Sequence, residues 1–235
     1  MQSIFEVYAI GAGPSSTHSM GPQLAARIFL QSLAAAPARV RVTLFGSLAA
    51  TGRGHWTDRT LVRTFGPIHV DIVFDTKTAD LPHPNTMKFE AFDSAGQPMK
   101  DWTVCSIGGG NLRDANGKPV ATGDPAEYPF TNIAEAMDTC HANDLAFWQL
   151  VERTEQDLWP RLEAIWNAMC DTIKRGLNSK QIILPGTLEL ARRAGTTWHR
   201  AHDLKGMPRD LGLVASFALA VAEENAAGMQ VVTTP

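Results

Sequence analysis

The chain has 235 residues, of which 44% are hydrophobic and 19% are charged, and its formal net charge at pH 7 is −3. That composition is typical of a soluble globular protein, and the lack of a basic excess argues against nucleic-acid binding. No apolar run is long enough to span a membrane and the first residues do not resemble a secretory signal, so the sequence predicts a cytoplasmic protein.

The first half of the chain predicts the elements of an α+β domain. Residues 4–10 fit either a short strand or a helical turn, and residues 22–35 have helical spacing. A helix or turn is also expected near 58–65. Alternating apolar residues predict strands over 39–45 and 86–92, and residues 100–107 are expected to pair with 86–92 in a hairpin. The apolar, β-branched segment 70–74 fits a strand or a short amphipathic element. The Gly- and Pro-rich segment 111–129 is predicted to be a loop and a domain boundary.

From residue 131 onward the pattern becomes helical, over 131–142, 145–175 and 208–228. Pro160 lies inside the second of these segments and is expected to break or kink it. The sequence therefore predicts an α+β domain over residues 1–130, followed by an all-helical domain over residues 131–235. Because the last helix is rich in apolar residues and few helices remain to cover it, we expect the second domain to be incomplete.

The cysteines are Cys105, Cys140 and Cys170. An odd number of cysteines at wide spacings fits neither a disulfide framework nor a metal-binding motif. We therefore expect no metal site on this chain and interpret these side chains as small buried hydrophobes.

The densest polar cluster lies just before the first predicted helix. It contains several hydroxyls and an imidazole, contributed by Ser15, Ser16, Thr17, Ser19 and His18. A helix N-terminus offers free backbone N–H groups and a positive dipole, so this stretch is a candidate pocket for a small anion or a carboxylate. An ordinary N-cap is the alternative, although one serine would be sufficient for a cap.

Further polar clusters follow predicted strands at 46–58 and 105–110. In the first of them, His55 has Asp58 nearby, and a histidine with a neighbouring carboxylate can be held in one tautomer and serve as a general base. A solvated loop histidine is the alternative. The second cluster ends in Gly108, Gly109 and Gly110, which suggests positive φ angles or a close approach of the backbone. Loops that follow regular elements in this way commonly converge on one pocket.

Several stretches resemble the signature motifs of one family. They are, in chain order, GPSSTHSMGP at 13–22, GSLAATGRGHWTD at 46–58, SIGGG at 106–110, LPGTLELARRA at 184–194, and EENAAG with VVTTP at 223–235. In this order, and over nearly the whole chain, they resemble the bacterial iron–sulfur-dependent L-serine dehydratases, also called L-serine ammonia-lyases.

The resemblance implies an α+β domain akin to the regulatory substrate-binding domain of some phosphoglycerate dehydrogenases, followed by a helical domain. In that family a 4Fe–4S cluster on cysteines binds the hydroxyl of L-serine as a Lewis acid, and no pyridoxal phosphate takes part. A base removes the α-proton, hydroxide leaves, and the product hydrolyses to pyruvate and ammonia, a step of amino-acid degradation and gluconeogenesis.

Carried over to this sequence, the resemblance implies roles for residues of each cluster. Candidates to hold the substrate carboxylate are Ser15, Ser16, Thr17 and His18, with Gly108, Gly109 and Gly110 giving close backbone approach. His55 becomes the leading candidate for the general base, with His18 as a further catalytic residue and Asp58 as the group that orients the base. From the helical domain, Asn225 and either Arg192 or Arg193 are expected to face the cluster site; a solvated surface is the alternative for the two arginines.

The cluster cysteines of the family lie downstream of the VVTTP segment, outside this sequence. We therefore expect this chain to bind no cluster and to be inactive alone, and to need a missing C-terminal half or a complementing α chain; a homodimer is compatible with these expectations. The alternative is a non-catalytic module that binds serine or a related hydroxy acid. A metal-free hydrolase using Ser15 and His55 is disfavoured, because the sequence has no G-x-S-x-G elbow.

Overall fold

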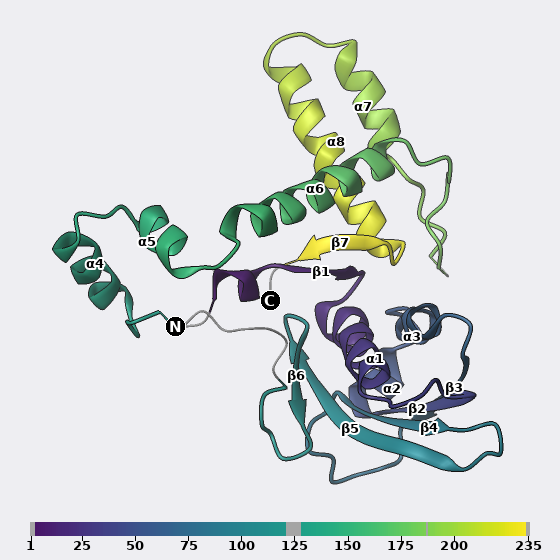
Figure 1. Ribbon diagram of the computed structural model, residues 1–235. Coiled ribbons are helices and arrows are strands. Elements are labelled where there is room, and N and C mark those ends of the chain that lie inside the picture. The colour runs from purple at the N-terminus through teal and green to yellow at the C-terminus, as the bar shows by residue number, and fades with distance from the viewer. Residues whose placement is uncertain (1–2, 121–127, 187, 234–235) are drawn as a thin grey trace.

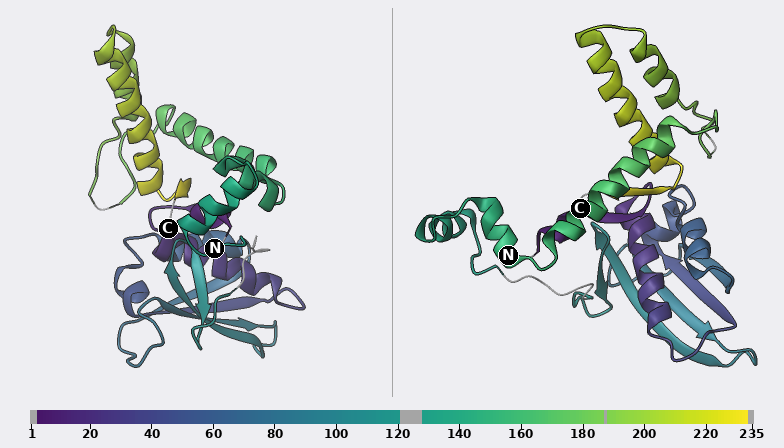
Figure 2. Two further views of the ribbon diagram at one scale, coloured as in Figure 1. Left: turned by 90° about the vertical axis from the view of Figure 1, so that its left-hand side faces the viewer. Right: turned by 45° about the horizontal axis from the view of Figure 1, so that its top comes forward.

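The computed structural model describes residues 3–120, 128–186 and 188–233. They form a sheet domain and a helical part that meet at a narrow junction, and a thin arm of helices projects from one side (Figures 1 and 2). The α+β fold expected from the sequence is confirmed. In the described ranges, no helix is both long enough and apolar enough to cross a membrane.

The sheet domain is built on a mixed five-stranded sheet with the strand order β3-β2-β4-β5-β6. Its strands are β2 (Arg39–Phe45), β3 (His69–Asp75), β4 (Thr86–Phe92), β5 (Pro98–Gly108) and β6 (Asn111–Asp114). β2 and β3 are parallel, and the other neighbours are antiparallel. Val40, Val42 and Leu44 alternate with more exposed residues along β2 and are fully buried, so the period of two in the sequence sets the face that packs.

Helices α1 (Gly21–Gln31), α2 (Gly46–Thr51) and α3 (Thr57–Phe65) lie on one face of this sheet (Figure 1). Phe29 of α1 and Leu61 of α3 are fully buried against Phe89 of β4, in one hydrophobic core. This packing fixes the N-terminal end of α1 above the edge of the sheet where β2 and β5 end.

The helical part contains α4 (Ile133–Ala142), α5 (Phe147–Thr154), α6 (Leu158–Leu177), α7 (Ala194–His202) and α8 (Met207–Ala226). α6 and α8 cross so closely that a side chain at Gly176 would collide with the backbone of Ala220. α4 and α5 form the arm at the left of Figure 1.

The N-terminal residues lie with the helical part rather than with the sheet domain. The 3₁₀ turn η1 (Ile4–Val7) leads into β1 (Ala9–Ala12), which pairs antiparallel with β7 (Gln230–Thr233). The buried carboxylate of Glu155 accepts hydrogen bonds from Ser3 Oγ at 2.9 Å and from Tyr128 Oη at 2.8 Å. Residues 3–12 thus pair with β7 and contact Glu155 of the helical part, and the division of the chain at residue 130 stays a prediction.

Most predicted strands are confirmed, at 39–45, 70–74, 86–92 and 100–107. The prediction of an uninterrupted loop over 111–129 is wrong at its start, because residues 111–114 add strand β6 to the sheet, while 121–127 lie outside the described residues. The helix predicted over 145–175 is two helices, and Pro160 lies in the first turn of α6, where proline is tolerated.

Helix α7 was not predicted. Its sequence contains glycine and two threonines, which have low helix propensity. Tertiary contacts hold it instead: Glu223 of α8 accepts hydrogen bonds from the backbone N–H groups of Arg193 and Ala194, at 2.6 and 3.1 Å, and so caps its first turn.

Candidate active site

The candidate site lies at the edge of the sheet where β2 and β5 end and β4 begins. A short π-helical turn, η2 (Ser16–Met20), runs over this edge and continues directly into α1. His18 comes from that turn, Ser47 from the first turn of α2, and His55 from the loop between α2 and α3. The first two polar clusters of the sequence thus meet here.

The two imidazoles form the centre of the site. The ring centroids of His18 and His55 are 4.6 Å apart. His55 Nδ1 lies 3.0 Å from the carbonyl oxygen of Thr51, and because a carbonyl oxygen only accepts, this nitrogen carries the proton. His55 Nε2 is then left with its lone pair and has no hydrogen-bond partner among the described residues, which is the arrangement required of a general base.

The surroundings of His18 disfavour its charged form. Its Nε2 lies 3.0 Å from Ser47 Oγ. Burial, and secondarily the neighbouring His55, lower the pKa of His18 below its ordinary value of 6.5. At pH 7 a positive charge on His18 is therefore disfavoured. A neutral His18 does not repel a proton that His55 takes up.

Hydrogen bonds to backbone carbonyls fix the η2 turn. Ser19 Oγ donates to the carbonyl of His55 at 2.8 Å, and Ser106 Oγ of β5 donates to the carbonyl of Thr17 at 2.8 Å. Ser15 Oγ accepts from the backbone N–H of His18 at 3.0 Å, so Ser15 caps the turn as an ordinary N-cap does. The turn is thus tied both to the His55 loop and to β5.

The hydroxyls of Ser16 and Thr17 have no partner among the described residues. Both side chains are half-buried, and Thr17 Oγ1 lies next to Gly108, whose φ is 108°. Of the hydroxyls predicted to hold a carboxylate, the structure thus leaves these two free to donate. Gly108 lies beside them, whereas Gly109 and Gly110 line a different cavity.

The C-terminal end of α8 reaches the same turn from the helical part. Asn225 Nδ2 donates to the carbonyl of Pro14 at 3.3 Å, and the N–H of Gly13 donates to the carbonyl of Met229 at 2.9 Å. A side chain at Gly13 would collide with the oxygens of Asn225. Asn225 therefore contacts the loop that leads into the η2 turn.

The remaining predicted residues lie elsewhere. The side chain of Arg192 is 7% exposed, and its Nη1 lies 3.0 Å from Glu224 Oε1. Arg192 is therefore not on a solvated surface, and its guanidinium is already paired rather than free to bind a substrate. Arg193 is exposed. Asp58 Oδ1 accepts from the N–H of Arg59 at 2.9 Å and makes no contact with His55, so the carbonyl of Thr51 orients that imidazole instead.

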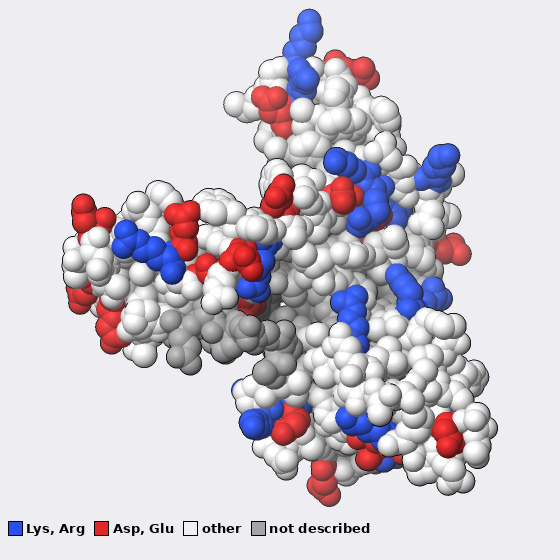
Figure 3. Space-filling model, in the orientation of Figure 1, with Lys and Arg blue, Asp and Glu red and all other residues white. Residues whose placement is uncertain are grey.

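Two arginines of α3 lie at the junction between the sheet domain and the helical part. Arg59 stacks on the ring of Trp56, with its guanidinium carbon 3.7 Å from the ring centroid, and Arg63 donates to the carbonyl of Gly228 at 3.3 Å. On the face shown in Figure 3, acidic side chains are numerous on the α4–α5 arm, whereas lysines and arginines lie on both sides of the junction.

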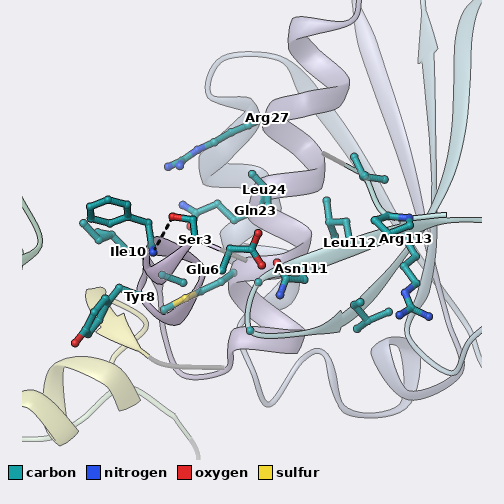
Figure 4. Close-up of a pocket in the computed structure, with 18 of the residues that line it drawn as sticks. Ser3, Glu6, Tyr8, Ile10, Gln23, Leu24, Arg27, Asn111, Leu112 and Arg113 are labelled. Atoms are coloured by element: carbon teal, nitrogen blue, oxygen red, sulfur yellow. Dashed lines mark hydrogen bonds between the residues drawn. The ribbon is translucent and has the colours of Figure 1, made fainter. Parts of the chain in front are cut away.

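Two cavities lie near the site without including either imidazole. One, of about 840 Å³, is lined by Trp56 and Asp58 on the sheet domain and by residues of the 184–190 segment. The other, of about 570 Å³, lies between residues 3–10, α1 and the β5–β6 turn (Figure 4). In it, Glu6 extends toward Asn111 beside Gln23, while Arg27 lies farther along α1.

The sequence reasoning did not single out three further polar residues near the candidate site, Ser47, Thr51 and Asn85. Ser47 and Thr51 lie inside a motif that was recognised, but only the fold shows that they hold His18 and His55. Asn85 belongs to no polar cluster of the sequence, and its side-chain oxygen is buried at this edge of the sheet without a partner among the described residues.

The described residues do not fit an iron–sulfur cluster. Cys105 is buried in β5, with its Sγ 3.4 Å from Thr86 Oγ1, whereas Cys140 lies in α4 and Cys170 in α6. Across the described ranges, no three or more His, Cys, Asp or Glu side chains gather as a metal site would require.

Comparison with known proteins identifies the relatives of this chain. Residues 3–66 match the family described as serine dehydratase beta chain, and residues 76–235 match the serine dehydratase alpha chain. The chain is 28% identical to an L-serine dehydratase of Helicobacter pylori and 30% identical to one of Streptomyces coelicolor, each over 99% of this chain and 62% of the relative. It is 29% identical to L-serine dehydratase 1 of Escherichia coli, over 100% of this chain and 63% of the relative. The chain thus spans less than two thirds of the length of these relatives.

Proposed function

This chain belongs to the serine dehydratase family, and from that premise we propose that it supplies the substrate-binding and proton-transfer residues of an L-serine dehydratase. The observation that carries this proposal is the imidazole pair. His55 has one nitrogen oriented by the Thr51 carbonyl and the other free, and His18 beside it is disfavoured as a cation.

The hydroxyls of Ser16 and Thr17 donate hydrogen bonds to the carboxylate of L-serine. His55 Nε2 takes the proton from Cα, and the hydroxyl group leaves Cβ with the bonding electrons. The 2-aminoacrylate that results tautomerises to an imine, which water hydrolyses to pyruvate and ammonia. Proton abstraction by a positioned imidazole contributes on the order of 10²–10⁴-fold to such a rate.

The resemblance implies a 4Fe–4S cluster that would act as a Lewis acid on the leaving hydroxyl. Because the cysteines of this chain lie in separate elements, we assign no ligand and no step to it here. We propose that polypeptide outside this chain holds the cluster and that the chain alone is inactive. We also propose that residues 1–130 and 131–235 correspond to the substrate-binding and helical domains of the complete cytoplasmic enzyme.

Substitution of His55 tests the proposal. We would measure L-serine binding to the chain by calorimetry, and pyruvate formation after adding the polypeptide that corresponds to the rest of a relative. His55→Asn should bind serine within about threefold of the wild type and lose pyruvate formation by at least about 10²-fold. His141→Asn, on an exposed position of α4, is the matched control.

The same experiment discriminates the alternative function, a non-catalytic module for serine or a hydroxy acid. Serine binding without pyruvate formation by the complemented wild type would favour the module. Equal pyruvate formation by His55→Asn and wild type would contradict the role of His55.

A further inference from the structure

The structure places Asn85 at the edge of the sheet that carries the candidate site. Asn85 directly precedes β4, and β4 lies between β2 and β5 in the sheet. The N–H of Ser47 donates to the carbonyl of Pro84 at 2.7 Å, and the N–H of Ser106 donates to the carbonyl of Asn85 at 3.0 Å. The backbone of Asn85 is therefore held from both sides.

Ser47 and Ser106, whose N–H groups hold this segment, also contact the η2 turn through their hydroxyl groups. Ser47 Oγ lies 3.0 Å from His18 Nε2, and Ser106 Oγ donates to the carbonyl of Thr17. Asn85 thus lies at the edge of the sheet over which the η2 turn passes, between the anchor of His18 and the anchor of Thr17.

The side chain of Asn85 is unpaired in this position. Its Oδ1 is buried and has no hydrogen-bond partner, and the amide makes no side-chain hydrogen bond within the described residues. Buried polar atoms in native proteins are nearly always paired, so an orphaned acceptor requires an explanation. The hydroxyls of Ser106 and Thr57 donate to backbone carbonyls, Ser47 Oγ pairs with His18 Nε2, and none of the three is hydrogen-bonded to Asn85 Oδ1.

We propose that Asn85 Oδ1 accepts a hydrogen bond from the α-ammonium group of the amino-acid substrate. This inference rests on the proposed function, in which Ser16 and Thr17 bind the carboxylate and His55 faces the α-proton. The ammonium is then the one charged group of the substrate that still needs an acceptor. Asn85 is accordingly the residue that selects an amino acid over the hydroxy acid of the same skeleton.

The test compares two ligands on the full chain by calorimetry: L-serine and L-glycerate, which has a hydroxyl in place of the ammonium. Asn85→Ala should weaken serine binding at least about tenfold and change glycerate binding less than about twofold. Asn85→Asp should retain serine, because a carboxylate also accepts from an ammonium, and should weaken the anionic glycerate. Asn116→Ala, in an exposed turn, is the matched control and should change neither affinity.

Thermal unfolding supplies a second readout. Because Oδ1 has no partner in the folded chain, Asn85→Ala should leave the Tm unchanged or raise it. A lower Tm together with equal losses for both ligands would assign Asn85 a structural role and overturn the inference.

The two proposals can fail separately. Serine binding by the wild type that is unaffected in Asn85→Ala overturns the inference about Asn85 and leaves the proposed function intact. Failure of the wild-type chain to bind either ligand overturns both.

Discussion

The substitution Glu224→Ala tests how the helical part holds the candidate site. Glu224 is 4% exposed; its Oε1 lies 3.0 Å from Arg192 Nη1 and its Oε2 lies 3.1 Å from Arg175 Nε. Removing one partner of a buried ion pair costs roughly 3–5 kcal/mol, because the other charge remains buried and uncompensated. Arg175 is 38% exposed, so its half of the network adds only about 0.2–1 kcal/mol.

Glu223 reduces the expected loss. Its Oε2 lies 3.9 Å from Arg192 Nη1 and retains part of the compensation, so we expect the free energy of unfolding to fall by about 3 kcal/mol. At about 2–4 °C per kcal/mol for a chain of this size, the Tm should fall by about 6–12 °C. Asn225 follows Glu224 directly, so the contact with Pro14 should weaken as well.

Thermal and urea unfolding followed by circular dichroism measure these changes. Glu163→Ala, on an exposed position of α6, is the matched control and should alter the free energy of unfolding by less than about 0.5 kcal/mol. The double substitution Arg192→Met with Glu224→Leu removes both buried charges and should recover most of the loss. A fall in Tm below about 2 °C for Glu224→Ala would refute the argument that this pair is buried and coupled.

Other expected outcomes concern His18, Gly13 and Tyr128. The folded state lowers the pKa of His18 from its ordinary 6.5, so this group's contribution to stability is complete above about pH 6.5 and is lost as the pH falls toward the lowered pKa. Between pH 7.5 and pH 5, the Tm of His18→Asn should therefore fall less steeply than the Tm of the wild type. Parallel curves of Tm against pH would contradict this. Gly13→Ala should cost roughly 1–3 kcal/mol by its collision with Asn225, whereas Gly54→Ala should be tolerated; equal urea midpoints would argue against the tight contact. Tyr128→Phe removes a 2.8 Å hydrogen bond to the buried carboxylate of Glu155 and should cost about 1.5–3 kcal/mol, and an unchanged Tm would show that the bond contributes nothing.

The strands of the sheet domain could be predicted because their signal is local. β2 alternates buried and more exposed residues, and β4 does so over the bounds that the sequence predicts. α7 could not be predicted in this way, because the carboxylate that caps it comes from Glu223, far along the chain. β6 is short and depends on pairing with β5.

The candidate site shows the same distinction between local and non-local signals. The sequence placed His18 and His55 in separate polar clusters after regular elements, and the structure brings their rings together. It could not show that Thr51 rather than Asp58 orients His55, because both are within four residues of that imidazole in the sequence. Nor could it identify Asn85, since an unpaired buried oxygen is visible only once its neighbours are placed.

The pairing of β1 with β7 has a consequence for the synthesis of the protein. Ala9 lies opposite Thr233, so the earliest strand to be made must wait for nearly the last residues of this sequence. At about 5–20 residues per second, that delay is on the order of 10–45 s. Pairings between nearby strands, such as that of β4 with β5, form quickly by comparison, because little chain entropy is lost in closing short loops. The five-stranded sheet therefore pairs its strands before β1 meets β7, and the β1–β7 pairing that joins the N-terminal residues to the helical part follows later.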